Sequence, residues 1–420
     1  MITQPRFSAA DGLRYGLLGL PLAFAALPLY VILPNHYARE FGVPLATLGA
    51  LLLAARLSDA VIDPWIGRLS DRLFTRSAAS VLALGAMASL MLATGFTLLF
   101  FPVTRQPQAL LAWAGAALVL TYAGYSALTV AHQSWGARLG GDESQRGRIV
   151  AWREGLGLAG VLLASLLSVA AGPAVASAAL VVALAVGWLG WARGRRPPPA
   201  RPDAVRFSIW LPLERPAFRR LLAVFLLNGI ASAIAATLVL FYVQDRLQAP
   251  VAMQPAFLGS YFLCAALSMP LWLAAVPRIG LARSWLCGMA LAIAVFIWAA
   301  ALGTGDTASF LAVCVLSGVA LGADLALPGA LLAGLIAEAG EQGRAEGAYF
   351  GWWNFATKLN LALAAGLALP LLGLAGYSPG ARDDAALRAL VIAYCVLPCL
   401  LKLVAAATLY FSLIRPGSPR

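Results

Sequence analysis

The chain has 420 residues, of which 61% are hydrophobic and only 11% are charged. Soluble domains are nearer to about 45–50% apolar, so this composition excludes an ordinary soluble protein and indicates a polytopic membrane protein. The net charge of +12 does not point to a nucleic-acid partner, because the arginines are spread over short segments between apolar runs.

Apolar stretches of about 20 residues recur about twelve times, and each is long enough to cross about 30 Å of hydrocarbon. The sequence therefore predicts an all-α integral membrane protein with 12 transmembrane helices. We expect these helices at residues 12–34, 43–66, 77–101, 108–132, 149–171, 173–193, 219–244, 253–276, 281–303, 308–332, 345–373 and 386–414. Basic residues concentrate in alternate loops, which predicts that both termini are cytoplasmic.

The second predicted helix carries two carboxylates in an apolar run. Asp59 and Asp63 are four residues apart, so they share one face of a helix. A charged group at membrane depth costs about 2.5 kcal/mol or more, and two like charges repel unless a cation or proton relieves them. The pair is a candidate cation site. The alternative is that both carboxylates lie near the membrane surface, where water solvates them.

A charged segment, GRLSDRLFTR, follows this helix. Its glycine, Gly67, would allow another helix to approach closely. Asp71, Arg72 and Arg76 would pair with groups at neighbouring helix ends and so latch one conformation of the protein. A generic basic turn is the alternative.

Other polar and aromatic side chains within the predicted helices are candidates for the wall of a substrate cavity: Arg153, Glu154, Asn228, Tyr261, Asp324, Trp352, Trp353, Asn354, Thr357 and Asn360. Asp324 has four possible roles: a proton carrier, a substrate ligand, a partner of Lys358, or half of a structural pair with a neighbouring helix. Two histidines, His36 and His132, are expected near helix ends, where solvent reaches them.

A basic, proline-rich segment interrupts the series of apolar runs. It reads RGRRPPPARPDAVR, which does not suit a spanning helix and suits an extended cytoplasmic linker. We therefore predict a six-helix bundle at 1–193, a linker at 194–218 and a second six-helix bundle at 219–420. This plan resembles the major facilitator superfamily, whose signature loop between the second and third helices is similar to GRLSDRLFTR.

Within that superfamily, ARLSDAVIDPWIG resembles a segment of the glycoside-pentoside-hexuronide:cation symporters, the family of melibiose permease. The resemblance implies that Asp59 and Asp63 bind a coupling sodium ion or proton. It also matches Arg153, in the segment 142–160, to an arginine that faces the sugar, and Lys358 to a lysine near the cation site. The alternative for Lys358 is that its side chain extends to the membrane interface.

The sugar site of that family is not retained. Ala23 stands about where these symporters have a sugar-binding aspartate, and Tyr122 and Ser126 stand about where they have an aspartate and a tryptophan. Tyr122 and Ser126 therefore remain candidates for contact with a different substrate.

These observations predict a secondary active transporter that couples symport of a small solute to H⁺ or Na⁺ by alternating access. No ATP-binding or other enzyme motif occurs, so we expect no enzymatic activity and no cofactor besides the coupling ion. An amphipathic lipid such as a lysophospholipid is the alternative substrate. Non-transporting alternatives are a membrane sensor or assembly factor, and a lipid-modifying enzyme. We expect a monomer, in contact with membrane lipid and not with nucleic acid, in a bacterial inner membrane.

Overall fold

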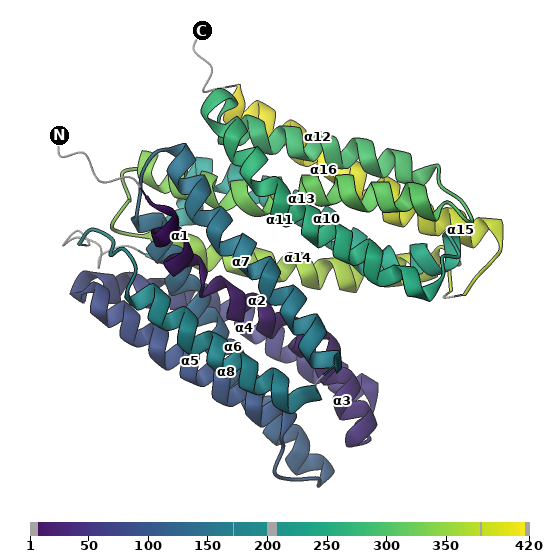
Figure 1. The fold of residues 1–420 in the computed structure, drawn as a ribbon, viewed down its shortest axis with the longest axis horizontal. Helices are drawn as coiled ribbons and strands as arrows, with labels where there is room; N and C mark the ends of the chain where they lie inside the picture. Colours follow the sequence, from purple (N-terminus) through teal and green to yellow (C-terminus); the bar gives the residue numbers. More distant parts are fainter. Residues whose placement is uncertain (1–6, 171, 200–207, 379, 416–420) are drawn as a thin grey trace. The chain divides into compact units, whose positions relative to one another are not determined.

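The computed structural model describes residues 7–170, 172–199, 208–378 and 380–415 (Figure 1). Across these ranges the chain forms helices joined by short loops, and it forms no β-strand. The all-α class predicted from the apolar runs is therefore confirmed.

The first predicted spanning segment is a series of short helices. The N-terminal part comprises α1 (Ala9–Gly16), α2 (Gly19–Leu27), the π-helical turn η1 (Pro28–Ile32) and α3 (Leu33–Glu40). Pro28 and Pro34 have no N–H to donate to the preceding turn, which explains why regular α-helix gives way to a π turn here.

Long, mostly uninterrupted helices make up the next part of the chain. They are α4 (Leu45–Arg76), α5 (Ala78–Phe100), α6 (Pro107–Arg138), α7 (Glu143–Ala170) and α8 (Gly172–Ala192). Helix α5 packs against α6 and α8, and α2 of the N-terminal part packs against α7, as Figure 1 shows.

The second half of the chain also consists of long helices, with short helical turns between some of them. It comprises α9 (Leu211–Glu214), α10 (Pro216–Phe241), η3 (Tyr242–Arg246), η4 (Val251–Met253), α11 (Gln254–Ile279), α12 (Leu281–Ala300), α13 (Thr307–Glu338), α14 (Glu346–Leu374), α15 (Asp384–Val391), η5 (Ile392–Val396), α16 (Leu397–Leu409) and η6 (Tyr410–Ile414). Helix α16 packs against α10 and α12.

Nine helical segments of the described chain are long and apolar enough to cross a membrane. Helix α4, which carries Arg56, Asp59 and Asp63, is not among them. The total of 12 spanning helices stays a prediction.

The chain divides into two compact units. Unit 1 consists of the described residues of Met1–Pro212 together with Ala333–Phe355, and unit 2 consists of Leu213–Leu332 and Ala356–Arg420 as far as they are described. Both α13 and α14 contribute to each unit. Part of the predicted linker, 200–207, lies outside the described residues, and the predicted domain boundaries stay predictions.

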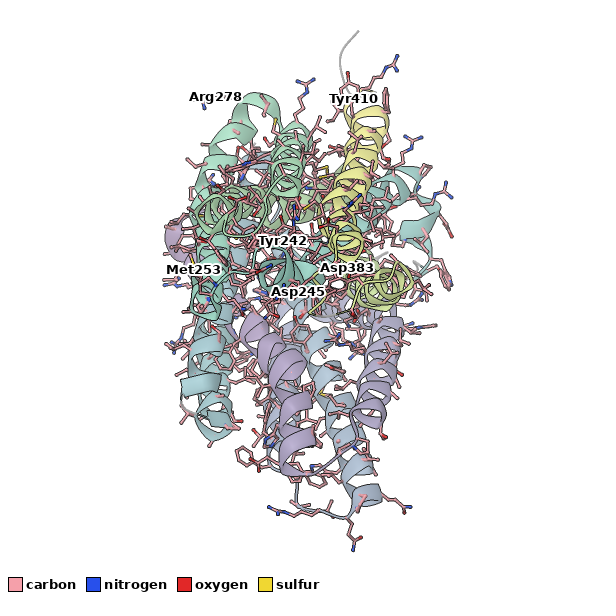
Figure 2. All side chains as sticks on the ribbon, turned by 90° about the vertical axis from the view of Figure 1, so that its right-hand side faces the viewer. Tyr242, Asp245, Met253, Arg278, Asp383 and Tyr410 are labelled. Atoms are coloured by element: carbon pink, nitrogen blue, oxygen red, sulfur yellow. The ribbon has the colours of Figure 1, made fainter. Side chains whose placement is uncertain are left out.

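Each unit has its own apolar core. Aliphatic residues make up most of both cores, and large aromatic residues lie among them: Phe24, Phe96, Trp135 and Trp191 in unit 1, and Tyr242, Phe257, Phe310 and Tyr394 in unit 2. Unit 2 is elongated along its helices. Figure 2 shows Arg278 and Tyr410 at one end of it and Asp245 and Asp383 at the other.

Candidate functional site

The predicted cation pair lies on α4 in unit 1. Asp59 is 8% exposed and Asp63 is fully buried, so neither carboxylate is solvated in the way the surface alternative requires. On the neighbouring helix α6, the Ser126 hydroxyl donates a hydrogen bond of 2.7 Å to Oδ1 of Asp59. Tyr122, one turn earlier on α6, is also buried. The structure thus brings Ser126, a predicted substrate residue, to the predicted cation pair.

Glycines bring the start of α14 against α4. A Cβ atom added at Gly67 would lie 2.0 Å from the carbonyl oxygen of Gly347. A Cβ atom added at Gly351 would lie 2.6 Å from the carbonyl oxygen of Asp63. The expected role of Gly67 in close helix approach is therefore visible in unit 1, and the backbone beside the acidic pair is part of the same contact.

A buried charge cluster, Asp71, Arg138 and Glu346, lies beyond this contact. Nη2 of Arg138 lies 2.8 Å from Oδ1 of Asp71 and 2.9 Å from Oε2 of Glu346. The backbone N–H groups of Gly347 and Ala348, in the first turn of α14, donate to Asp71 at 2.8 and 2.9 Å. A helix N-terminus favours a carboxylate through these free N–H groups and its dipole.

Burial disfavours the charged form of the Asp71 carboxyl group. Removal from water raises the pKa of Asp71 to about 7 from its ordinary value of 3.8, and the Arg138 guanidinium opposes that rise. Asp71 lies five residues beyond the predicted span 43–66, at the end of α4. The Phe74 ring covers the guanidinium of Arg138, with its centroid 4.1 Å from Cζ.

The predicted arginines of the latch do not join this cluster. Arg72 and Arg76 are exposed. Consecutive residues on a helix point about 100° apart, so Arg72 cannot share the buried face of Asp71. The arginine that pairs with Asp71 is Arg138 at the end of α6, and the latch role of Arg72 and Arg76 stays a prediction.

On α7, Arg153 pairs with its sequence neighbour. Nη2 of Arg153 lies 2.6 Å from Oε1 of Glu154, and both side chains are half-buried. His132 was expected to be within reach of solvent, and this was wrong. Its ring is fully buried and stacks on Tyr15, and its Nε2 donates to the backbone oxygen of Tyr15 at 2.9 Å.

Unit 2 holds a second buried ion pair. Nζ of Lys402, on α16, lies 2.9 Å from Oδ2 of Asp324, on α13, and donates to Oδ1 of Asn228 at 2.7 Å. Nε1 of Trp285 donates to Oδ1 of Asp324 at 2.8 Å. Of the roles left open for Asp324, the structure thus supplies a partner on a neighbouring helix.

Sequence reasoning missed Lys402, although a signal was present. The chain has 30 lysine and arginine residues, of which only Lys358 and Lys402 are lysines, and both lie inside predicted spanning helices. Lysine enters apolar surroundings more readily than arginine does, because it can release its proton. Lys402, a lysine in the middle of an apolar run, was therefore as good a candidate for a buried functional residue as Asp324.

The remaining candidates occupy varied positions on α14 and its neighbours. Asn354 is buried and donates to Oε1 of Gln133 at 2.8 Å, which fits the alternative that it bonds a neighbouring helix. Trp353 is buried and Thr357 is exposed. Lys358 is half-buried in unit 2, whereas Asp59 and Asp63 belong to unit 1, so the approach of Lys358 to the pair stays a prediction.

The family of the chain follows from a sequence match. A profile of the family described as MFS/sugar transport protein matches residues 14–193 and 195–415. The chain belongs to this family. Among curated proteins, none matches the chain.

Solved structures of transporters share the fold of this family member. A bacterial homologue of the iron transporter ferroportin, in an outward-facing state, is similar with a TM-score of 0.71 at 15% identity, over 96% of this chain and 98% of that chain. The E. coli fucose:proton symporter FucP is similar with a TM-score of 0.63 at 15% identity, over 95% of this chain and 98% of that chain.

The structural similarities show the fold of the chain, and the family match shows that it is a transporter. The predicted membership of the major facilitator superfamily is confirmed. The protein is an integral membrane protein and a secondary transporter, not an enzyme.

Proposed function

We propose that the protein is a symporter that couples transport of a small solute to H⁺ or Na⁺ bound at Asp59 and Asp63. One observation carries the proposal: two carboxylates one helical turn apart are buried on α4. Two buried negative charges repel in surroundings of low dielectric, and a cation or proton between them lowers that energy. The Ser126 hydroxyl adds a neutral oxygen beside Asp59.

Lys358 completes the proposed cation site. In the ion-free state its ammonium would neutralise one carboxylate, and an incoming cation would displace it. Transport would proceed by alternating access, and the cluster around Asp71 would hold one of the alternating conformations. Gly67 permits the helix contact on which that cluster depends.

The proposed substrate site takes its polar groups from several helices. In unit 1, Arg153 and Glu154 offer a half-buried charge pair, and in unit 2, Asp324 offers a charge pair with Lys402. Tyr122, Ser126, Trp353, Asn354 and Thr357 are the remaining proposed contacts. We place the protein, as a monomer, in a bacterial inner membrane with both termini in the cytoplasm.

A stability screen tests the cation site. The purified full-length protein is melted in sodium chloride, lithium chloride or choline chloride at several pH values, beside Asp59→Asn and Asp63→Asn. A ligand that binds only the folded state raises the melting midpoint. Asp384→Asn is the matched control, because Asp384 is an exposed carboxylate in the first turn of α15.

Each outcome has a distinct meaning. Stabilisation by sodium in wild type and the control, and in neither site variant, supports a sodium symporter. A response to pH alone that both site variants lose supports a proton symporter. If both site variants respond like wild type under every condition, Asp59 and Asp63 do not bind the coupling ion.

A further inference from the structure

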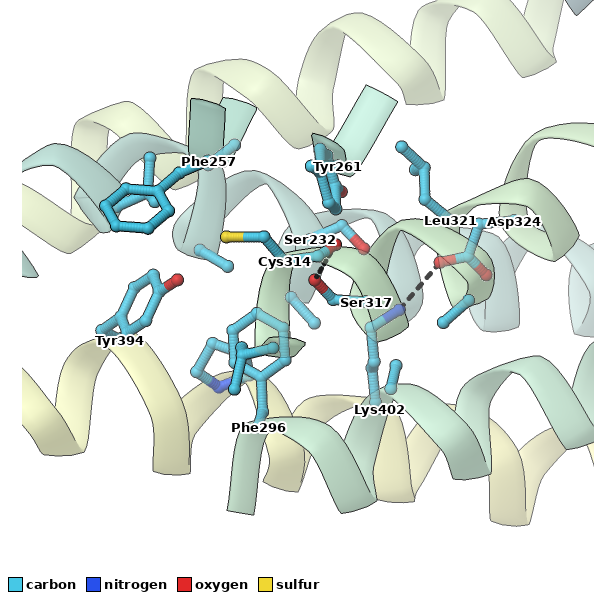
Figure 3. A pocket seen from close by; sticks show the side chains of 18 of the residues that line it. Ser232, Phe257, Tyr261, Phe296, Cys314, Ser317, Leu321, Asp324, Tyr394 and Lys402 are labelled. Atoms are coloured by element: carbon cyan, nitrogen blue, oxygen red, sulfur yellow. Dashed lines mark hydrogen bonds and ion pairs between the residues drawn. The ribbon is translucent and has the colours of Figure 1, made fainter. Parts of the chain in front are cut away.

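Unit 2 contains a cavity of about 320 Å³, lined by side chains of α10, α11, α12, α13, η5 and α16 (Figure 3). This volume falls at the lower end of the range of small-molecule sites, which is roughly 300–1,000 Å³. All the residues that line the cavity belong to unit 2, whereas Asp59 and Asp63 belong to unit 1. It is therefore a separate candidate for ligand binding.

One end of the cavity is charged. Asp324 and Lys402 are the only charged residues among the described side chains that line it. Lys402 uses two hydrogen-bond donors, to Asp324 and Asn228, and Asp324 accepts from Lys402 and Trp285. An ammonium group has three donors and a carboxylate has about four acceptor positions. Each member of the pair can therefore form one more hydrogen bond to a ligand.

The other end of the cavity is aromatic. Figure 3 shows Phe257 and Tyr394 far from the ion pair, with Phe296 between them and Lys402. Along α13, Cys314 and Asp324 both line the cavity and lie ten residues apart, which corresponds to roughly 15 Å of helix. The cavity thus has room for a long apolar group attached to a small polar head.

The charges of the pair select the kind of head group. Lys402 and Asp324 together are neutral, so a ligand with one net charge would leave that charge uncompensated in an apolar cavity. A zwitterion instead offers a carboxylate to Lys402 and an ammonium to Asp324. We propose that this cavity binds a zwitterionic amino acid with a large apolar side chain, held by Lys402 and Asp324.

This inference names a substrate class for the transporter and rests on the proposed function. Its test uses equilibrium binding without any ion gradient. A negative binding result therefore refutes the inference and leaves the cation site untouched. A failed cation test at Asp59 and Asp63 leaves the binding result standing.

Three probes with the same apolar body test the choice of head group. They are 4-phenyl-L-phenylalanine, its analogue without the amino group, and its analogue without the carboxyl group. Calorimetric titration of the purified full-length protein measures the Kd of each. A hydrogen bond to a charged group is strong enough that we expect each single-charge analogue to bind at least about tenfold more weakly than the zwitterion.

Variants then assign the preference to the ion pair. Lys402→Met alone leaves a buried carboxylate and can impair folding, so the double variant Lys402→Met with Asp324→Leu removes both charges together. We expect the double variant to bind the three probes with similar Kd values. Leu403→Met is the matched control. Leu403 is the next residue of α16 and is 56% exposed, so this variant should keep the wild-type preference for the zwitterion.

Several results would overturn the inference. One is that either single-charge analogue binds wild type as tightly as the zwitterion does. A second is that the folded double variant keeps the preference for the zwitterion. A third is that wild type binds none of the three probes.

Discussion

The contact between α4 and α14 allows a sharp test, because α4 contains two glycines in different surroundings. Around Gly49 no atom lies within 4 Å of an added Cβ, whereas at Gly67 the added Cβ would lie 2.0 Å from a backbone oxygen of Gly347. Alanine is favoured over glycine in a helix interior by about 1 kcal/mol. Gly49→Ala should therefore stabilise the protein by about that amount.

Gly67→Ala gains the same helix propensity but has to push two backbones apart. Inserting a methyl group into a filled space costs about 1–3 kcal/mol, and a contact this short belongs at the upper end of that range. The net expectation is a loss of about 2 kcal/mol, so the two variants should differ by about 3 kcal/mol in opposite directions from wild type.

Thermal unfolding of the purified protein, followed by tryptophan fluorescence, measures this difference. In a domain of 150–250 residues, 1 kcal/mol shifts the midpoint by roughly 2–4 °C, and the shift is smaller in a longer chain. We expect Gly49→Ala to melt a few degrees above Gly67→Ala. Equal midpoints, or the reverse order, would refute the close contact between α4 and α14.

Three further predictions concern the buried charges of unit 1. Arg138→Met should lower the free energy of unfolding by about 3–5 kcal/mol, because Asp71 and Glu346 lose their shared cation. If this cause is right, adding Asp71→Asn should restore part of the melting midpoint, and no recovery would contradict it. Ser126→Ala should cost about 1.5–3 kcal/mol through the lost hydrogen bond to the Asp59 carboxylate, whereas Ser126→Thr, which keeps a hydroxyl, should melt closer to wild type. Because burial raises the pKa of Asp71 to about 7 from 3.8, the folded state holds a proton there that the unfolded chain has released. Stability should therefore fall as pH rises from about 4 to 7, and a melting profile of Asp71→Asn as steep as that of wild type would contradict this.

The sequence predicted the helices through their apolar length, and this worked where a helix is no longer than the membrane. The run 77–101 corresponds to α5, Ala78–Phe100. Apolar length did not predict where α4 and α6 end. These helices continue to Arg76 and Arg138, whereas the predicted spans stop at residues 66 and 132. Apolar length reports the thickness of hydrocarbon, and a helix can continue beyond it with polar residues.

The candidate site was predictable only where its chemistry is local. Asp59 and Asp63 were recognised because their spacing and their apolar surroundings are both visible in one segment. The partner of Asp71 was not, since Arg138 lies 67 residues away and only the packing of α6 on α4 selects it over Arg72. Pairs that join distant helices depend on tertiary contacts, which a single sequence does not contain.

The arginines at the end of α4 and at the end of α6 should respond differently to ionic strength. Exposed charges such as those of Arg72 and Arg76 are screened over about 8 Å at physiological salt. The pair of Arg138 and Asp71, with side chains 1% and 7% exposed, excludes the mobile ions that would screen it. Salt should therefore weaken the attraction of Arg72 and Arg76 for anionic groups. The contact between the first turn of α14 and α4 should persist from dilute buffer to concentrated salt.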